Sequence, residues 1–150
     1  MPISENVKLG KDVRIFHPDL VNLYDCVIGD ETRIGAFVEI QVGAEIGSRC
    51  KISSHTFICE GVTIEDEVFV GHGVMFINDA FASGGPARGK KELWRETVIG
   101  NRVSIGSNAT IMPVRIADDV VIGAGSVVTR DIMAAGTYAG NPARLLKLRK

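Results

Sequence analysis

Residues 28–76 read IGDETRIGAFVEIQVGAEIGSRCKISSHTFICEGVTIEDEVFVGHGVMF, and a six-residue periodicity runs through them. Every sixth residue is large and apolar at nine successive positions: Ile28, Ile34, Ile40, Ile46, Ile52, Ile58, Ile64, Val70 and Phe76. Four residues after each of the first eight comes a small or β-branched residue, such as Thr32 or Ala44. Neither an α-helix nor a single alternating strand has this period, whereas a solenoid of short strands does. The stretch therefore predicts a parallel β-helix with three sides and about 18 residues per coil.

The composition fits one domain and argues against several classes of function. The 150 residues are 45% apolar, which is enough for a core, and the net charge is −1. That charge gives no electrostatic reason to expect binding to nucleic acid or to an anionic membrane. The sequence has no run of 18 apolar residues, and its beginning lacks the pattern of a signal peptide. We therefore expect a cytoplasmic protein.

The three cysteines fit core packing better than redox or metal chemistry. Their number is odd and their spacing matches no metal site, which argues against a disulfide framework. Cys26 and Cys50 fall at the small interior positions of the repeat, whereas Cys59 falls at a corner. We expect no metal site in this chain.

The repeat is interrupted once and ends before the C-terminus. Residues 77–97, INDAFASGGPARGKKELWRET, lack the period, and a loop of this length is usually functional or disordered. Solenoids often place such insertions on the binding face. The period resumes at Ile99 and runs to Val128, which gives about six coils in a single domain, residues 1–150. Residues 136–150 form the expected C-terminal tail, in which a turn at residues 140–142 precedes a short basic helix or tail at residues 143–150.

Two stretches resemble a known family. The segment VIGNRVSIGSNATIMPVRIADDVVIGAGSVVTRDI, followed by AGNPARLLK, resembles hexapeptide-repeat acyltransferases. The segment HTFICEGVTIEDEVFVGHGVMFIND is similar to sugar-nucleotide N-acetyltransferases, in particular those that acetylate UDP-2-acetamido-3-amino-2,3-dideoxyglucuronate. The resemblance implies a left-handed coil, although short parallel connections are ordinarily right-handed. It also implies a homotrimer with an active site between neighbouring prisms, and acetyl-CoA bound along the C-terminal coils.

The activity implied by this resemblance is acetyl transfer from acetyl-CoA to the amine of a nucleotide-linked amino sugar, for surface polysaccharide biosynthesis. Transfer to a hydroxyl of a sugar or of serine is an alternative, and a non-catalytic scaffold subunit is another. A carbonic anhydrase of the same fold is poorly supported, because the three histidines lie far apart and lack the close pair that this enzyme needs.

Acetyl transfer to an amine requires a positioned thioester, an acceptor for the amine proton and a donor for the developing oxyanion. We expect Asn78 and His72 to be catalytic and to flank one edge of the prism beside the loop. Asn78 matches the Phe-x-Asn phrase of the resembling enzymes, where the Asn contacts the substrate near its amine. The alternatives are that Asn78 only caps a turn and that the amine needs no side-chain base. Several relatives carry a catalytic His in the loop, but residues 77–97 contain none.

The remaining candidate contacts are assigned to the two substrates. His55 and Asp79 are candidates for sugar binding, and Arg88 and Arg95 have forked donors suited to a pyrophosphate. A solvated charge cluster is the alternative for the two arginines. The candidate contacts for coenzyme A lie in the late turns and the tail: Gly106, Ser107, Asn108, Gly123, Ala124, Arg144 and Lys147. Trp94 is expected to anchor the loop rather than to stack on a base.

Overall fold

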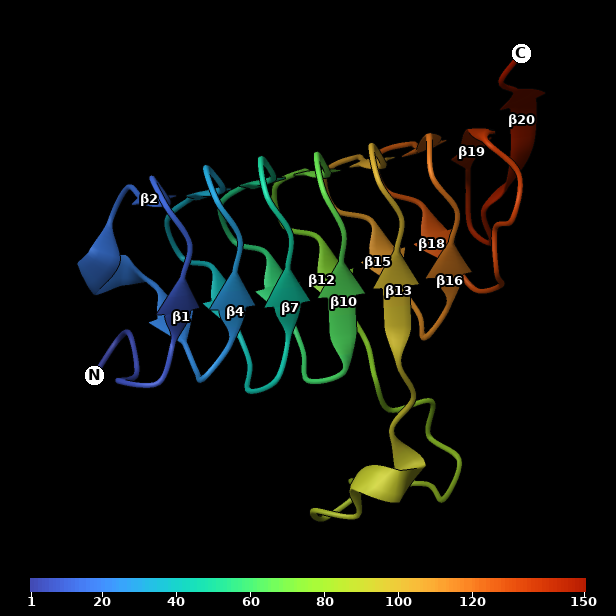
Figure 1. Ribbon diagram of the computed structural model, residues 1–150. Helices are drawn as coiled ribbons and strands as arrows, with labels where there is room; N and C mark the ends of the chain where they lie inside the picture. The colour runs from blue at the N-terminus through green and yellow to red at the C-terminus, as the bar shows by residue number, and fades with distance from the viewer.

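The computed structural model describes residues 1–150 and shows a three-sided prism of parallel β-strands (Figure 1). Three short strands make one coil, and six coils follow one another from β1 to β18. In Figure 1 the chain ascends the front sheet, crosses over the top and returns behind, while it advances from left to right. That sense of rotation is left-handed, so the predicted left-handed parallel β-helix is confirmed.

Each side of the prism is one sheet. Sheet 1 consists of β1 (Lys8–Leu9), β4 (Val27–Ile28), β7 (Glu45–Ile46), β10 (Val62–Ile64), β13 (Thr97–Ile99) and β16 (Arg115–Ile116). Sheet 2 consists of β2 (Arg14–Ile15), β5 (Arg33–Ile34), β8 (Lys51–Ile52), β11 (Phe69–Val70), β14 (Ser104–Ile105), β17 (Val120–Ile122), β19 (Gly136–Ala139) and β20 (Arg144–Leu148). Sheet 3 consists of β3 (Asn22–Leu23), β6 (Glu39–Ile40), β9 (Phe57–Ile58), β12 (Met75–Phe76), β15 (Thr110–Ile111) and β18 (Val127–Val128). Two 3-10 turns complete the set, η1 (Pro18–Leu20) and η2 (Lys91–Leu93).

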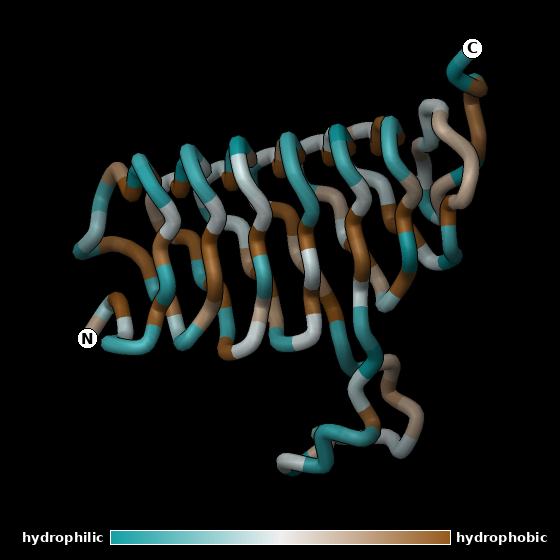
Figure 2. The backbone as a smooth tube through the Cα atoms, viewed as in Figure 1, coloured by the Kyte–Doolittle hydropathy of each residue, from teal (hydrophilic) through white to brown (hydrophobic).

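The six-residue period arises because each side directs one large and one small side chain into the prism. All nine large positions and all eight small positions of residues 28–76 are buried. Hydrophobic segments accordingly recur along the tube in Figure 2. Two interior threonines are hydrogen-bonded to the next coil: the Thr32 hydroxyl donates to the Gly47 carbonyl at 2.7 Å, and the Thr56 hydroxyl donates to the Gly71 carbonyl at 3.0 Å. The result is one continuous core of 30 buried residues that runs the length of the prism.

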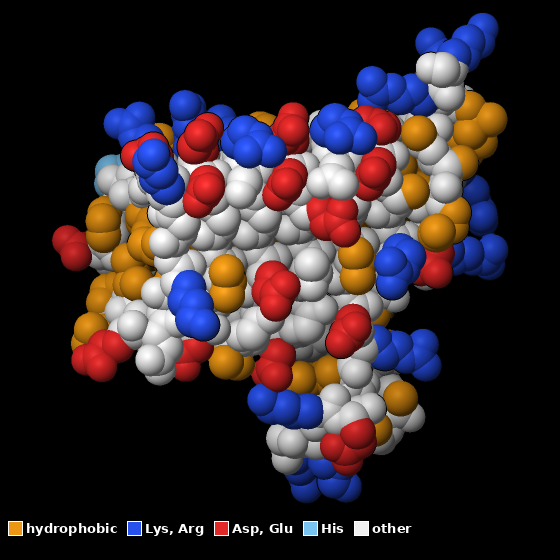
Figure 3. Space-filling model, viewed as in Figure 1, with side chains coloured by type: hydrophobic (Ala, Val, Ile, Leu, Met, Phe, Trp, Pro, Cys, Tyr) orange, Lys and Arg blue, Asp and Glu red, His pale blue; other side chains and the backbone are white.

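The turns between sheets stack into three edges. The charged edge joins sheet 1 to sheet 2, and acidic and basic side chains alternate along it at the top of Figure 3. Arg102 on this edge lies 2.8 Å from Asp119, one coil further on. The histidine edge joins sheet 2 to sheet 3 and contains residues 53–55, 71–73, 106–108 and 123–125. The loop edge joins sheet 3 to sheet 1 and carries the insertion.

The insertion is the one large departure from the prism. Strand β12 ends at Phe76 and β13 begins at Thr97, so the protruding loop comprises residues 77–96, one residue fewer than predicted. In Figure 1 the loop hangs below the prism between the fourth and fifth coils.

The expected C-terminal tail is wrong in its secondary structure. Residues 136–139 form β19, which pairs in parallel with β17, and residues 144–148 form β20, which pairs antiparallel with β19. The turn predicted at residues 140–142 is present, but a strand follows it and not a helix. A helix of fewer than ten residues is marginal in water, whereas the open edge of β19 offers unpaired backbone groups. Pairing with that edge therefore decides the conformation.

Candidate active site

His72 projects from the histidine edge in the fourth coil, between β11 and β12. Its side chain is exposed, and its Nδ1 lies 2.8 Å from the hydroxyl oxygen of Ser54 in the third coil. Its backbone N–H donates to the hydroxyl of Ser107 in the fifth coil at 3.2 Å. When Nδ1–H donates to Ser54, Nε2 carries a free lone pair directed away from that bond. The arrangement is therefore able to accept a proton from a bound amine.

Ser54 is the site residue that the sequence interpretation missed. A coil contains about 18 residues, and Ser54 precedes His72 by 18, so the two occupy equivalent turns of successive coils. That spacing is the signal that was available in the sequence. The signal is weak, because a serine at a turn ordinarily forms only local hydrogen bonds.

His55 lies beside Ser54 on the same edge, one coil before His72. Its ring stacks on that of Phe37, with 4.9 Å between ring centroids and 12° between ring planes. Its φ of 63° is in the left-handed region, so the turn directs the side chain outward. The stack fixes the imidazole at the surface of the prism, near the Ser54–His72 pair.

The turns predicted to bind coenzyme A follow His72 along the same edge. Gly106 packs so closely on the sixth coil that a Cβ would lie 2.4 Å from the backbone nitrogen of Ala124. Ser107 and Asn108 contact the fourth coil, since the Asn108 N–H donates to the His72 carbonyl at 2.8 Å. The edge beyond His72 thus carries small, uncharged side chains on closely stacked backbone, from Gly106 to Ala124.

The two predicted tail contacts are separated from each other. Arg144 is paired with Ala139 in the sheet. Ala139 packs against Gly123 on the histidine edge, since a Cβ added to Gly123 would lie only 2.8 Å from the Ala139 Cβ. Arg144 therefore lies at the end of β20 nearest the histidine edge. Lys147 is paired with Thr137, toward the other end of the strand.

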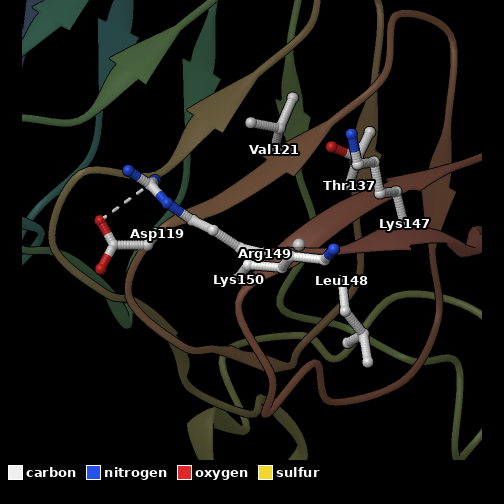
Figure 4. A pocket seen from close by; sticks show the side chains of 8 residues that line it. Asp119, Val121, Thr137, Lys147, Leu148, Arg149 and Lys150 are labelled. Atoms are coloured by element: carbon white, nitrogen blue, oxygen red, sulfur yellow. Dashed lines mark hydrogen bonds and ion pairs between the residues drawn. The ribbon is translucent and has the colours of Figure 1, made fainter.

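Lys147 lines a hollow of about 400 Å³ near the charged edge, together with Asp119 and Arg149 (Figure 4). A hydrogen bond from Arg102 holds the pKa of Asp119 below its usual value. Only Arg144 of the tail pair is therefore grouped with the late turns.

Asn78 lies on the loop edge and not on the histidine edge, so the prediction that Asn78 and His72 flank one edge is wrong. Both residues stand two positions after a large interior residue, and equivalent positions six residues apart occupy successive corners. Strand β12 and the width of sheet 3 separate them. The half-buried Asn78 amide donates to the Glu60 carbonyl at 3.0 Å, so it does hold the start of the loop.

The neck of the loop is built by Asp79 and its surroundings. Asp79 and Trp94 form an antiparallel bridge, and the Asp79 carboxylate accepts from the Phe81 N–H at 2.8 Å. Lys91 pairs with Glu60 at 2.9 Å, which leaves Arg88 and Arg95 as exposed arginines without an ion pair. The predicted substrate residues thus form two groups, with His55 on the histidine edge and Asp79, Arg88 and Arg95 at the loop.

The cysteines belong to the interior, as predicted for Cys26 and Cys50. All three are free and buried, including Cys59. Burial raises the pKa of Cys26 and Cys59 to about 11 and also raises that of Cys50. At neutral pH the three thiols are protonated and are poor nucleophiles.

No group of three or more His, Cys, Asp or Glu side chains is placed to hold a metal ion. No helix has the length and apolar character needed to cross a membrane.

Two family models match the repeat. Residues 96–130 match the hexapeptide repeat of succinyl-transferase, and residues 25–60 match the bacterial transferase hexapeptide of six repeats. Together with the left-handed prism, these matches show that the chain carries the hexapeptide repeat of bacterial transferases.

Among curated proteins, the chain is similar to the bifunctional protein GlmU of Nostoc, at 29% identity over 97% of the chain and 33% of the relative. It is also similar to serine acetyltransferase of Mycobacterium tuberculosis, at 34% identity over 77% of the chain and 48% of the relative. The chain spans about a fifth to a third of the length of the GlmU proteins it matches.

Two solved structures share the fold. A variant of AntD, an N-acyltransferase from Bacillus cereus in complex with dTDP and coenzyme A, aligns with a TM-score of 0.79 at 24% identity, over 95% of this chain and 83% of AntD. A variant of GDP-perosamine N-acetyltransferase from Caulobacter crescentus, in complex with coenzyme A and GDP-perosamine, aligns with a TM-score of 0.54 at 19% identity. The alignment covers 96% of this chain and 55% of that enzyme.

Proposed function

We propose that this chain is an acetyltransferase that moves the acetyl group of acetyl-CoA to the amine of a nucleotide-linked amino sugar. One observation carries the proposal. His72, hydrogen-bonded to Ser54, lies on the histidine edge directly before the turns from Gly106 to Ala124, whose side chains are small and uncharged. This arrangement joins a proton acceptor to a surface on which a pantetheine arm can lie against backbone. AntD and GDP-perosamine N-acetyltransferase, which share the fold, were crystallised with coenzyme A and with dTDP or a GDP-linked sugar.

The chemistry requires a neutral amine beside the thioester. The amine nitrogen attacks the acetyl carbonyl carbon, the carbon–sulfur bond then breaks, and the coenzyme leaves as a thiolate that takes up a proton. In the proposal, His72 Nε2 accepts the proton that the amine loses, and Ser54 fixes the ring by accepting from Nδ1–H. Gly106, Ser107, Asn108, Gly123, Ala124 and Arg144 are the proposed contacts of the coenzyme, whereas Lys147 lies farther along β20.

Asn78 and the loop complete the proposed site from a second subunit. One chain alone separates Asn78 from His72 by a full side of the prism. A homotrimer that places the loop edge of one prism beside the histidine edge of the next would bring them to one amine. In this arrangement Asn78, Asp79, Arg88 and Arg95 contact the acceptor on the neighbouring subunit, and His55 contacts it from the subunit that supplies His72.

The activity is tested by following thiol release from acetyl-CoA with a panel of UDP- and dTDP-linked amino sugars. We expect release with at least one amino sugar and none with the corresponding hydroxyl sugar. No release above background with any acceptor would contradict the proposal.

Subunit sharing is tested by co-expressing His72→Ala and Asn78→Ala chains. Random mixing restores about a quarter of the sites if each site uses two chains. Mixed oligomers no more active than the two separate variants would show that the site is not shared.

O-acetyl transfer is a second candidate, favoured by the similarity to serine acetyltransferase and by the Ser54–His72 pair, which is also able to deprotonate a hydroxyl. Serine and hydroxyl sugars in the same assay distinguish the two. A scaffold role predicts that calorimetry detects no binding of coenzyme A.

Since acetyl-CoA and nucleotide sugars are made in the cytoplasm, we place the reaction there, in the biosynthesis of a surface polysaccharide.

A further inference from the structure

Three cations stand in register on the outer face of sheet 2, in the first three coils. Arg14 is paired with Arg33, and Arg33 with Lys51, along adjacent parallel strands. All three side chains are exposed, and none forms an ion pair with a carboxylate. We call these residues the cationic row.

The cationic row differs from the charged edge, where the arginines are paired with carboxylates. On the charged edge, Arg49 and Arg102 each lie within 4 Å of carboxylates in the next coil, at 3.6 Å from Glu67 and 2.8 Å from Asp119. Neighbouring strands are about 4.8 Å apart, and like charges directly opposite each other destabilise a sheet. The three cations of the row therefore repel one another, whereas the arginines of the charged edge are neutralised by carboxylates. An anion bound to the row would relieve this repulsion.

Two members of the row are held near the surface by aromatic rings. The Arg14 guanidinium lies 5.5 Å from the centre of the Phe16 ring, and the Lys51 ammonium lies 5.6 Å from that of Phe69. Such contacts limit the freedom of the charged groups without neutralising them. The row is thus partly ordered before any ligand arrives.

The row borders a hollow of about 500 Å³ that is lined by four cations and two carboxylates. Arg49 is the fourth cation, and Asp12 and Glu31 contribute the carboxylates from the charged edge. The net charge of the lining is positive, and the volume is sufficient for a pair of phosphate groups.

The charge on this face changes at the coil that carries His72. The outward residues that continue the row are Phe69, Ser104 and Val121, none of them charged. Lys51 precedes Ser54, the partner of His72, by three residues, which span at most about 10 Å. The cations therefore lie on the N-terminal side of the proposed reaction centre, and the small-residue turns lie on its C-terminal side.

We propose that the cationic row binds the diphosphate of a nucleotide-linked acceptor, with the sugar ring lying between the row and His72. Arg33 and Lys51 are the principal ligands: Arg33 offers forked donors, and Lys51 offers a point charge nearest to Ser54. Coenzyme A then approaches from the opposite end of the edge. This inference rests on the proposed function for the identity of the acceptor, and it assigns the phosphates to the prism rather than to Arg88 and Arg95 of the loop.

The test measures binding of UDP, dTDP and coenzyme A by calorimetry, in the absence of turnover. We expect Arg33→Met and Lys51→Met each to weaken binding of one of the two diphosphates by roughly tenfold, with the affinity for coenzyme A unchanged. Lys8→Met, an exposed outward cation on sheet 1, is the matched control and should bind all three ligands as the unmodified chain does. An unchanged melting temperature excludes misfolding as the cause of any loss.

Three results would overturn the inference: equal diphosphate affinity in the row variants, loss of affinity only in Arg88→Met or Arg95→Met, or no binding of either diphosphate. Failure of the proposed function appears differently. Diphosphate binding that depends on the row, without acetyl transfer to any amino sugar, would contradict the reaction and leave the subsite in place. Transfer at an unchanged KM for the acceptor in Arg33→Met and Lys51→Met would contradict the subsite and leave the reaction in place.

Discussion

Ser54 and His72 show how much a single hydrogen bond decides in this fold. His72 is exposed and Ser54 is half-buried, and the 2.8 Å contact between them depends on the stacking of the third and fourth coils. His72 was a candidate from the sequence because it points outward next to the loop. Ser54 acquires its proposed role as a positioning residue only once the coil spacing is fixed.

Substitution of these residues separates proton acceptance from positioning. His72→Ala should lower kcat about a hundredfold or more, since a general base contributes that much. Ser54→Ala should lower kcat by roughly tenfold with little change in KM for either substrate, because the hydroxyl orients the ring and does not bind substrate. Ser54→Thr, which keeps the hydroxyl, should recover most of the rate. A Ser54→Thr variant as slow as Ser54→Ala would contradict the positioning role.

The buried thiols predict a loss of stability at alkaline pH. Their pKa is raised from 9.0 to about 11 in Cys26 and Cys59, so between these pH values the unfolded chain loses protons that the folded chain retains. The free energy of unfolding should be unaffected by these groups below pH 9 and fall as the pH rises toward 11, by roughly 2–3 kcal/mol for each thiol.

Urea unfolding at about pH 7.5, about pH 9 and about pH 10.5 measures this decline. The control replaces the thiols with residues that do not titrate, Cys26→Val and Cys59→Ala. It should decline less over the same range, and an identical decline would show that other groups are responsible.

At the scale of elements, β20 and the loop depart from the regular repeat in different ways. The loop was predictable from the sequence because the period stops at Phe76 and resumes near Ile99. The strand β20 was not predictable, because its partner is the edge of β19 and nothing in residues 143–150 specifies that edge. Local sequence favours a short helix there, and tertiary hydrogen bonds outweigh this preference.

Removal of residues 144–150 should expose the edge of β19. Amide hydrogen exchange in residues 136–139 should then become much faster, because the antiparallel partner of these residues is gone. The coils before β17 should keep their protection, since each is paired to its own neighbours. Removal of Lys150 alone is the control and should change neither region. Unchanged exchange in residues 136–139 would mean that β20 does not stabilise the edge.

At the scale of the whole molecule, the prism is a single core in which each coil rests on the next. Backbone hydrogen bonds run from coil to coil along all three sheets, and the 30 buried core residues form one cluster. The proposed site follows from this geometry, because stacking aligns equivalent turns into edges and assigns each edge a chemical character. Apart from the insertion on the loop edge, the charged, histidine and loop edges differ in which residues occupy equivalent positions of the repeat.

Neighbouring residues on β17 test the division between interior and surface. Ile122 is 1% exposed and Val121 is 42% exposed. Ile122→Ala should lower the free energy of unfolding by about 2–5 kcal/mol through lost burial and an unfilled cavity. Val121→Ala should change it by about 0.5 kcal/mol or less. Equal effects in urea unfolding would contradict the inward and outward assignment.

The sequence by itself determined the prism, its six coils, the interior residues and the place of the loop. It did so because each six-residue side of the prism has one large and one small interior residue at the same positions. That periodicity is visible in the sequence without any knowledge of contacts. Only the tertiary structure decided that the Ser54 hydroxyl lies within hydrogen-bonding distance of His72 and that residues 144–148 form a strand. These two facts depend on how successive coils lie against each other and on the pairing of an open sheet edge. The separation of Asn78 from His72 already follows from the six-residue repeat, because positions six residues apart occupy successive corners. In residues 28–76 every position that the repeat assigns to the interior is buried, whereas the neighbours of the outward residues are set by the stacking of the coils.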